Sequence, residues 1–292
     1  MHVGLVGVGC MGGAMARRLL DCGHAVGVRD LDPAREAEAA AAGAQVAASP
    51  AALAAGCELL IVAVVDAAQT REVLFGPDGA AAALPPGAAV LLCPTIGPDD
   101  VEAAARALAE RGLACIDAPM SGGPARARDG SMSLMVACDD AAWLRWQPLL
   151  AQLAVRLLRV GTRPGDGART KLVNNLLAAV NLAGAAEAMA LAERLGLDAA
   201  TTLAVIEQSS GQSWIGSDRL RRALAGDAGV RARTALLAKD SALALAAAAA
   251  AGVKPPLGRL AAAAFAQACR DGWAEADDSA LLDAVRAAFA RG

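Results

Sequence analysis

The most constraining feature of this sequence is an alternation of strand-like and helix-like segments that stops partway along the chain. Up to about residue 161, short runs rich in Val, Ile and Leu are separated by Ala-, Glu- and Arg-rich stretches of helical periodicity. Such alternation is typical of βαβ units that form a parallel sheet. The predicted strands cover residues 2–8, 25–30, 58–64, 89–93, 114–118, 133–137 and 155–160.

From about Gly165 onward, only helix-like segments follow. Their alanines have the highest intrinsic helix propensity, and larger apolar residues that can pack are spaced among them. We therefore predict an α/β domain over residues 1–162 and an all-helical domain over residues 163–292, with a hinge at 161–167. The predicted helices of the second domain cover residues 166–195, 199–208, 213–224, 233–251, 255–271 and 277–290.

Composition limits the classes of function and location. The net charge of −3 gives no electrostatic footprint for nucleic acid or an anionic membrane. The longest strongly apolar runs, at 59–65 and 243–251, are too short to cross a bilayer, and the N-terminus does not resemble a signal peptide. Seven cysteines without paired spacing predict reduced thiols and a cytoplasmic protein. With only two histidines we expect no histidine-based metal site, and without tyrosine we expect no Tyr-based dehydrogenase centre.

A glycine-rich motif follows the first predicted strand and precedes an amphipathic helix. In such a GxGxxG pattern the first glycine allows a tight turn, the second lets the backbone approach a pyrophosphate, and the third lets helix and strand pack closely. Amide groups at the helix N-terminus then bind the phosphates. The pattern predicts a Rossmann dinucleotide site formed by Gly7, Val8, Gly9, Cys10, Met11 and Gly12.

Asp30, at the end of the second predicted strand, bears on which dinucleotide is bound. A carboxylate there accepts hydrogen bonds from the ribose 2′-hydroxyl and repels a 2′-phosphate, which favours NAD over NADP. Arg29 and Arg35 are close enough in sequence to reach a 2′-phosphate, so NADP stays the less favoured alternative.

Two further strand ends should line the same crevice, because ligands of open α/β sheets bind beyond the carboxyl ends of the strands. They are Val64-Val65-Asp66 and the segment containing Thr95. For Thr95, a simple helix cap before Gly97 is an equally good interpretation.

Lysine and asparagine are rare in this arginine-rich chain. The only lysines are Lys171, Lys239 and Lys254, and all three asparagines lie between residues 174 and 181. An ammonium group is needed where a donor must also lose its proton, which arginine does not do. Lys171 and Asn175 are four residues apart and share a helix face. A partly desolvated Lys171 is a candidate general base, and the Asn175 amide a candidate substrate ligand; the alternative is an exposed lysine beside capping asparagines.

Ser121-Gly122-Gly123 follows another predicted strand. Consecutive amides in such a loop can bind a carboxylate because no bulky side chain keeps it away. A glycine turn without function is the alternative.

With these motifs, the chain resembles the β-hydroxyacid dehydrogenase family over essentially its whole length. The resemblance rests on GLVGVGCMGGAMARRLLDCGHAVGVRD at the start, DAPMSGGPARARDGSM at 117–132, GDGARTKLVNN at 165–175 and AKD at 238–240. It implies a Rossmann domain joined through a long helix to an all-α domain, a homodimer or homotetramer, and NAD(P)-dependent oxidation at a CH–OH carbon. It also implies that Lys171 is the catalytic acid/base, Asn175 the substrate amide, the 121–123 loop the carboxylate site, and Lys239 and Thr95 neighbours of the nicotinamide.

The resemblance leaves the substrate open within the family. The Lys-x-x-Asn-Asn pattern at 171–175 favours a 3-hydroxyisobutyrate-like substrate, whereas 64–76, 210–214 and 277–281 are more similar to L-threonate dehydrogenases. Trp214 would then be a wall of the substrate pocket, with burial between helices as the alternative. A semialdehyde or glyoxylate reductase of the same family is a further alternative, and CPTI at 93–96 departs from the family pattern.

Outside hydroxyacid oxidation, a dinucleotide-binding protein without catalysis is the alternative of a different class. We would expect such a protein to have replaced Lys171, which is present here. Imine reductases usually lack this lysine, and 6-phosphogluconate dehydrogenases need a longer helical domain.

Overall fold

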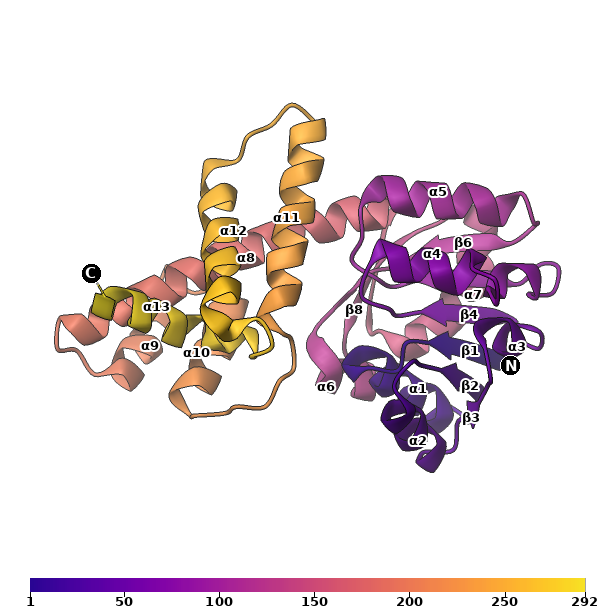
Figure 1. Ribbon diagram of the computed structural model, residues 1–292, viewed down its shortest axis with the longest axis horizontal. Coiled ribbons are helices and arrows are strands. Elements are labelled where there is room, and N and C mark those ends of the chain that lie inside the picture. The colour runs from indigo at the N-terminus through magenta and orange to yellow at the C-terminus, as the bar shows by residue number, and fades with distance from the viewer. Residues whose placement is uncertain (292) are drawn as a thin grey trace. The chain divides into compact units, whose positions relative to one another are not determined.

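The computed structural model describes residues 1–291 and forms two compact units, residues 1–171 and the residues from Leu172 onward (Figure 1). The division lies inside the helix α8 (Asp166–Arg194). The predicted boundary after residue 162 lies instead between the last strand and that helix.

The first unit contains a nine-stranded sheet with the order β3-β2-β1-β4-β5-β6-β8-β7, in which β9 also pairs with β8. Its strands are β1 (His2–Val6), β2 (Ala25–Arg29), β3 (Gln45–Val46), β4 (Leu59–Val62), β5 (Ala89–Leu92), β6 (Ala114–Asp117), β7 (Met120–Ser121), β8 (Ser133–Ala137) and β9 (Arg156–Gly161).

All seven predicted strands are confirmed, but the sheet is not wholly parallel as predicted. From β3 to β6 every pair is parallel, whereas β8 runs antiparallel to both β6 and β7. The chain reverses after β6, because β8 follows through the short segment 118–132 and returns antiparallel beside β6. The strands β3 and β7 were not predicted, since two residues are too few to show periodicity.

Helices cover both faces of this sheet (Figure 1), which explains why its strands are almost continuously apolar. Alternate residues of β4 belong to different core clusters: Leu59 and Ile61 pack with α1 and α7, Leu60 and Val62 with α3, α4 and α5. The helices of this unit are α1 (Cys10–Asp21), α2 (Pro33–Ala41), α3 (Pro50–Ala54), α4 (Ala67–Phe75), η1 (Ala80–Ala82), α5 (Pro98–Ala109), α6 (Gly123–Asp129) and α7 (Asp140–Leu153).

The second unit is helical, as predicted. Besides the main part of α8, it contains α9 (Ala199–Glu207), α10 (Trp214–Leu224), α11 (Thr234–Ala250), α12 (Pro256–Ala268), η2 (Cys269–Trp273), η3 (Asp278–Ala280) and α13 (Leu281–Arg291). Phe265 of α12 is fully buried against Leu182 and Ala186 of α8 and Leu237 of α11. The predicted helix 255–271 ends earlier as an α-helix, because Gly272 takes a φ of +97° and turns the chain.

The helix α8 is also long and apolar enough to cross a membrane by length and composition alone, with a mean hydropathy of 1.4 over its best window. This differs from our prediction that every apolar run is too short. The core helix of a soluble protein passes the same test. Within the second unit, α8 contributes fully buried Ala179 and Met189 to two core clusters.

Candidate active site

The glycine-rich turn has the shape that a dinucleotide phosphate needs. Gly7 has a φ of +90°, and a side chain there would meet the Ala63 carbonyl oxygen at 2.7 Å. A Cβ at Gly12 would lie 1.9 Å from the Gly7 oxygen, whereas one at Gly9 would meet no atom within 4 Å. The helix α1 begins at Cys10, and no side chain caps it from Gly9. Its first amide groups therefore face the open space beside Gly9, and the residues fit the predicted cofactor.

Asp30 is held against this turn. Its Oδ2 accepts a hydrogen bond from the Val8 amide at 2.6 Å, and its Oδ1 accepts one from the Asp32 amide at 2.9 Å. A carboxylate oxygen has more than one lone pair, so Asp30 can still accept from a ribose hydroxyl.

The two arginines near Asp30 differ in how closely they are paired with carboxylates. Arg29 donates to the Glu36 carboxylate and to the Asp30 carbonyl oxygen, each at 2.6 Å. Although burial opposes it, the hydrogen bonds from the Asp30 amide and Arg29 hold the pKa of Glu36 below its usual value. Arg29 is thus neutralised in place, whereas Arg35 forms longer ion pairs of 3.9 Å with Asp32 and 3.6 Å with Glu38.

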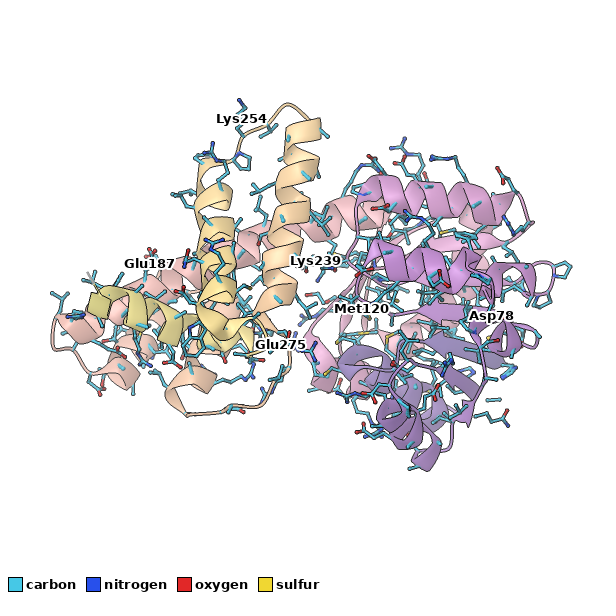
Figure 2. The ribbon with its side chains drawn as sticks, viewed as in Figure 1. Asp78, Met120, Glu187, Lys239, Lys254 and Glu275 are labelled. Carbon is cyan, nitrogen blue, oxygen red and sulfur yellow. The ribbon has the colours of Figure 1, made fainter. Side chains whose placement is uncertain are left out.

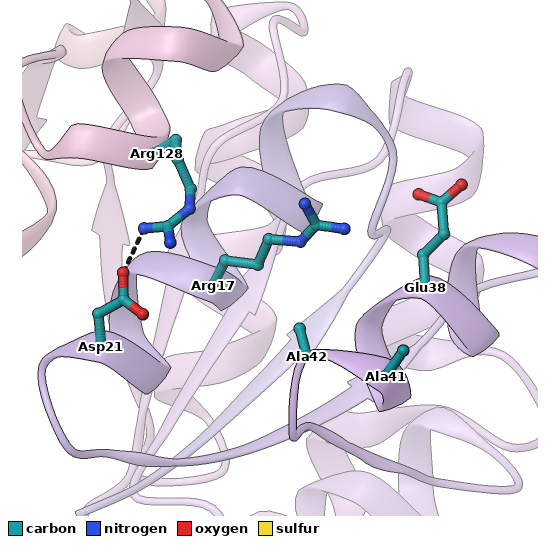
Figure 3. Close-up of a pocket in the computed structure, with 6 residues that line it drawn as sticks. All are labelled: Arg17, Asp21, Glu38, Ala41, Ala42 and Arg128. Carbon is teal, nitrogen blue, oxygen red and sulfur yellow. Dashed lines mark hydrogen bonds and ion pairs between the residues drawn. The ribbon is translucent and has the colours of Figure 1, made fainter.

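Two cavities adjoin the helices around the glycine turn. The larger, about 370 Å³, is lined by residues of α1, α2 and α6, and Figure 3 shows Arg128 pairing with Asp21 at its wall. The other, about 250 Å³, reaches the turn itself and is lined by Val8, Gly9, Cys10, Gly13, Ala14, Arg17, Arg35, Glu38, Ala39, Pro124 and Arg128.

The predicted strand-end residues have varied local roles. Asp66 caps α4, accepting a hydrogen bond from the Gln69 amide at 2.8 Å, and the Val65 amide donates to the Gln69 side chain at 3.0 Å. Val65 is 48% exposed, and Val64 is partly buried. At the other strand end, the cap position of α5 is Gly97, so Thr95 is not its cap.

The Ser121-Gly122-Gly123 loop joins β7 to α6. Gly122 and Gly123 have φ values of +131° and +77°, a backbone that other residues rarely adopt. A Cβ at Gly122 would press on the Arg126 side chain at 3.0 Å, whereas one at Gly123 would meet nothing within 4 Å. The loop therefore keeps an open approach to its amides at Gly123.

Lys171 of α8 reaches the start of this loop. It is only 8% exposed, and its Nζ donates a hydrogen bond of 2.6 Å to the carbonyl oxygen of Met120. The alternative of an exposed lysine is therefore wrong. The first unit thus brings the candidate acid/base to the residue that precedes Ser121.

The start of α8 is anchored by Asp117, which the sequence reasoning did not single out. This carboxylate is 1% exposed and accepts hydrogen bonds from the amides of Gly165 and Ala168 at 2.7 and 3.0 Å. The only sequence signal for it is a charged residue at the end of an apolar strand.

Within the second unit, Asn175 is part of a buried polar cluster. Its Nδ2 donates to Asp240 Oδ2 at 2.6 Å, and its Oδ1 accepts from Asn174 at 3.0 Å. Lys239 Nζ lies 3.1 Å from Asp240 Oδ1. Asp240 was also missed as a site residue, although the AKD motif contains it.

The remaining lysine and Trp214 lie in more open surroundings. Lys254 is exposed in the loop between α11 and α12, while Lys239 lies along α11 (Figure 2). Trp214 is the first residue of α10 and is 48% exposed, with the Arg219 guanidinium 5.9 Å from its ring centre. Burial of Trp214 between helices is therefore not observed.

Comparison with known proteins places both halves of the chain. Residues 2–161 match the family model of the NAD binding domain of 6-phosphogluconate dehydrogenase, and residues 165–285 match that of the NAD-binding domain of NADP-dependent 3-hydroxyisobutyrate dehydrogenase. The L-threonate dehydrogenase of Cupriavidus necator is 39% identical over 96% of this chain and 95% of its own. This chain belongs to the β-hydroxyacid dehydrogenase family.

Other members of the β-hydroxyacid dehydrogenase family are also similar to this chain. The 3-hydroxyisobutyrate dehydrogenase of Pseudomonas aeruginosa is 37% identical over 73% of this chain and 71% of its own. A solved structure described as 3-hydroxyisobutyrate dehydrogenase from Salmonella typhimurium is 37% identical, covers 97% of this chain and 99% of its own, and has a TM-score of 0.90. The predicted family, fold class and NAD-linked oxidoreductase class are confirmed.

The contrast between Gly9 and Gly12 gives a matched pair of substitutions. We expect Gly12→Ala to lower the free energy of unfolding by about 1–3 kcal/mol or more, because the new methyl group overlaps the Gly7 carbonyl. Gly9→Ala should leave stability unchanged and raise the KM for NAD by at least about tenfold, by filling the space for the phosphates. Urea denaturation and steady-state kinetics measure the two effects, and equal behaviour of the two variants would contradict the assignment.

Proposed function

We propose that this enzyme moves a hydride between NAD and a small β-hydroxyacid of the 3-hydroxyisobutyrate type, with Lys171 as the general acid/base. The observation that carries the proposal is the buried Lys171 ammonium group beside the Ser121-Gly122-Gly123 loop, in a chain with few lysines. A proton carrier next to an anion-binding loop suits a substrate that bears both a hydroxyl and a carboxylate.

In the oxidative direction, Lys171 takes the proton of the substrate hydroxyl while the carbon that bears it loses its hydride; in reduction, Lys171 returns the proton. When bound, the nicotinamide supplies the hydride acceptor in oxidation and the donor in reduction. The amides of the 121–123 loop hold the substrate carboxylate. This fixes the reacting carbon, because orientation provides much of the rate enhancement in such transfers.

Asn175 holds a substrate oxygen in this proposal. Its amide nitrogen carries two hydrogens, and the bond to Asp240 uses one of them. Asp240 therefore sets the orientation of the amide and leaves the second hydrogen for the substrate. From the family resemblance, we assign Lys239 to the nicotinamide side of the site and Trp214 to a wall of the substrate pocket.

The preference for NAD over NADP rests on Asp30 and Arg29. The carboxylate of Asp30 is fixed beside Val8, where a 2′-phosphate would meet its charge. Arg29 is already neutralised by Glu36, which leaves Arg35 as the cation for the NADP alternative. We place Val64, Val65, Asp66 and Thr95 at the same crevice.

L-threonate oxidation is the second candidate. Five relatives named L-threonate dehydrogenase are 33–39% identical to this chain over nearly its whole length. Against this, the Asn174-Asn175 pair follows the 3-hydroxyisobutyrate pattern.

We further propose a cytoplasmic homodimer or homotetramer, without nucleic-acid or membrane partners. Exposed apolar residues on two helices of the second unit support self-association: Val173 and Leu177 on α8 are 72% and 60% exposed, and Leu257 and Leu260 on α12 are 65% and 70% exposed.

A kinetic panel tests the substrate assignment. It compares 3-hydroxyisobutyrate, L-threonate, D-glycerate, L-serine and 6-phosphogluconate, each with NAD and with NADP. We expect the highest kcat/KM with 3-hydroxyisobutyrate and NAD. A maximum with L-threonate supports the second candidate, and no turnover of any β-hydroxyacid sinks the proposed function in favour of a binding protein.

Replacing Lys171 tests its role in proton transfer. Lys171→Ala and Lys171→Arg should each lower kcat by at least about 10²-fold, the usual scale for a lost acid/base. The arginine variant is the matched control, because it keeps the charge but does not release a proton. Binding of NADH, followed by fluorescence, should be unchanged in both variants, and near-normal turnover in either one contradicts the role.

Replacing Asp30 tests cofactor choice. Asp30→Ser removes hydrogen bonds to a charged group worth about 1.5–3 kcal/mol, so the NAD/NADP ratio of kcat/KM should fall by about tenfold or more. Glu58→Gln serves as the control, because it removes a carboxylate just before the first residue of β4, where Glu58 accepts a hydrogen bond from the His2 amide, and it should leave the ratio close to its original value. An unchanged ratio in Asp30→Ser refutes the assignment.

A further inference from the structure

Asp117 joins two segments of the first unit that are far apart in sequence. It is the last residue of β6 and is paired in register with Ala137 of β8. Its Oδ2 alone accepts both hydrogen bonds from the start of α8, one from Gly165, 48 residues later, and one from Ala168. The first amides of a helix have no partner within it, so a strand residue here provides the cap.

The start of α8 is tightly packed around this cap. A Cβ at Gly167 would lie 2.8 Å from the Asp117 Cγ and 2.8 Å from the Met135 carbonyl oxygen of β8. The start of α8 therefore packs directly against the end of β6 and the middle of β8. A shift of the Asp117 carboxylate must move the helix start, because no side chain lies between them.

Both residues of the Lys171–Met120 hydrogen bond are close in the chain to Asp117 or to an amide that it binds. Lys171 follows Ala168 by three residues, within one helical turn, and its acceptor Met120 follows Asp117 by three residues. We propose that Asp117 is a positioning residue, whose ionised carboxylate holds the Lys171 amine beside the Ser121-Gly122-Gly123 loop. This inference rests on the proposed role of Lys171, which it deepens.

The charge of Asp117 depends on pH in the working range of an enzyme. Burial raises its pKa to about 6, against the hydrogen bonds from Ala168, Gly165 and Gly167, and the nearby charge of Asp166 adds to the rise. The other titratable groups that face it are the Cys93 and Cys115 thiols. Burial raises their pKa values far above the usual range, so both stay neutral. Asp117 is thus ionised at pH 8 and protonated at pH 5.

The direction of the Asp117 pKa shift distinguishes a positioning role from a stabilising role, because the two roles predict different effects on stability when Asp117 is replaced. The pKa of Asp117 is higher in the folded than in the unfolded chain, where it is about 3.9. Its favourable contribution to folding is therefore complete below that value and is lost as the pH rises through about 6. At pH 8 the ionised carboxylate lowers stability, so a neutral isostere should not destabilise the protein.

Asp117→Asn is the decisive variant because it mimics the protonated residue. At pH 8 we expect kcat to fall by about 10- to 100-fold, the scale of a small misplacement of a catalytic group, with a Tm equal to or above that of the wild type. The ratio of wild-type to variant kcat should approach one at pH 5, since both enzymes are then neutral at position 117. A ratio that stays constant with pH, or a lower Tm with normal kcat, overturns the proposal.

Asp166→Asn is the matched control at the same helix start. Asp166 does not hold the Gly165 or Ala168 amides, but its charge raises the pKa of Asp117. Its replacement should leave kcat at pH 8 within about twofold, a change of under 1 kcal/mol, and move the acid-side loss of activity to lower pH. A fall in kcat at pH 8 as large as that of Asp117→Asn would show that the effect is not specific to Asp117 and would overturn the proposal.

A measurement without substrate separates this proposal from the proposed function. In the unliganded wild-type enzyme, the amide proton shifts of Gly165 and Ala168 should titrate together with a midpoint near pH 6 and should not titrate in Asp117→Asn. This NMR titration of the wild type holds even if the variant does not fold. If no hydroxyacid is turned over but these amides titrate, the proposed function fails and the anchor stands; amides that do not titrate near pH 6 refute the anchor.

Discussion

The structure depends on one satisfied helix terminus. The helix α8 begins in the first unit and continues as a core element of the second, so its first amides have to find acceptors on the sheet. Asp117 supplies one oxygen for two of these amides, and Gly167 lets the helix approach the strand ends closely. Because the helix start is fixed, Lys171, which follows Ala168 within one helical turn, is held in place within the first unit.

Each of the two polar groups that we assign to the chemistry is held by a second residue. The Lys171 ammonium is oriented by a backbone carbonyl, and the Asn175 amide by the carboxylate of Asp240. A lysine side chain has four rotatable bonds, and ordering it costs conformational entropy that must be met before the substrate arrives. Lys171 and Asn175 are each 8% exposed, so their side chains lose this entropy when the protein folds and not when the substrate binds.

Much of the fold could be predicted from the sequence because its signals are local. Alternating apolar runs indicated β1, β2, β4, β5, β6, β8 and β9, and the alanine-rich helices followed from propensity. The antiparallel placement of β8 and the two-residue strand β7 depend on pairing between segments, which a local pattern does not contain.

The candidate site also contains residues that local sequence patterns predict and residues whose roles depend on distant contacts. Motif spacing indicated Lys171, Asn175 and the glycine turns, since each is a local cluster of unusual residues. The roles of Asp117 and Asp240 depend on contacts 48 and 65 residues apart in the chain, and nothing in their immediate sequence reveals the partner. Asp66 makes the converse point: a residue predicted at a strand end for the cofactor also caps the next helix.

Glu36 bears on the proposed cofactor selectivity through the two groups that it binds. Arg29 would be a suitable cation for a 2′-phosphate, but Glu36 binds both its guanidinium and the amide of Asp30. The same carboxylate thereby neutralises the arginine and fixes the backbone from which the Asp30 side chain projects. Loss of Asp30 alone would therefore lower the NAD/NADP ratio without making Arg29 available to a 2′-phosphate, because Arg29 stays paired until Glu36 is also changed.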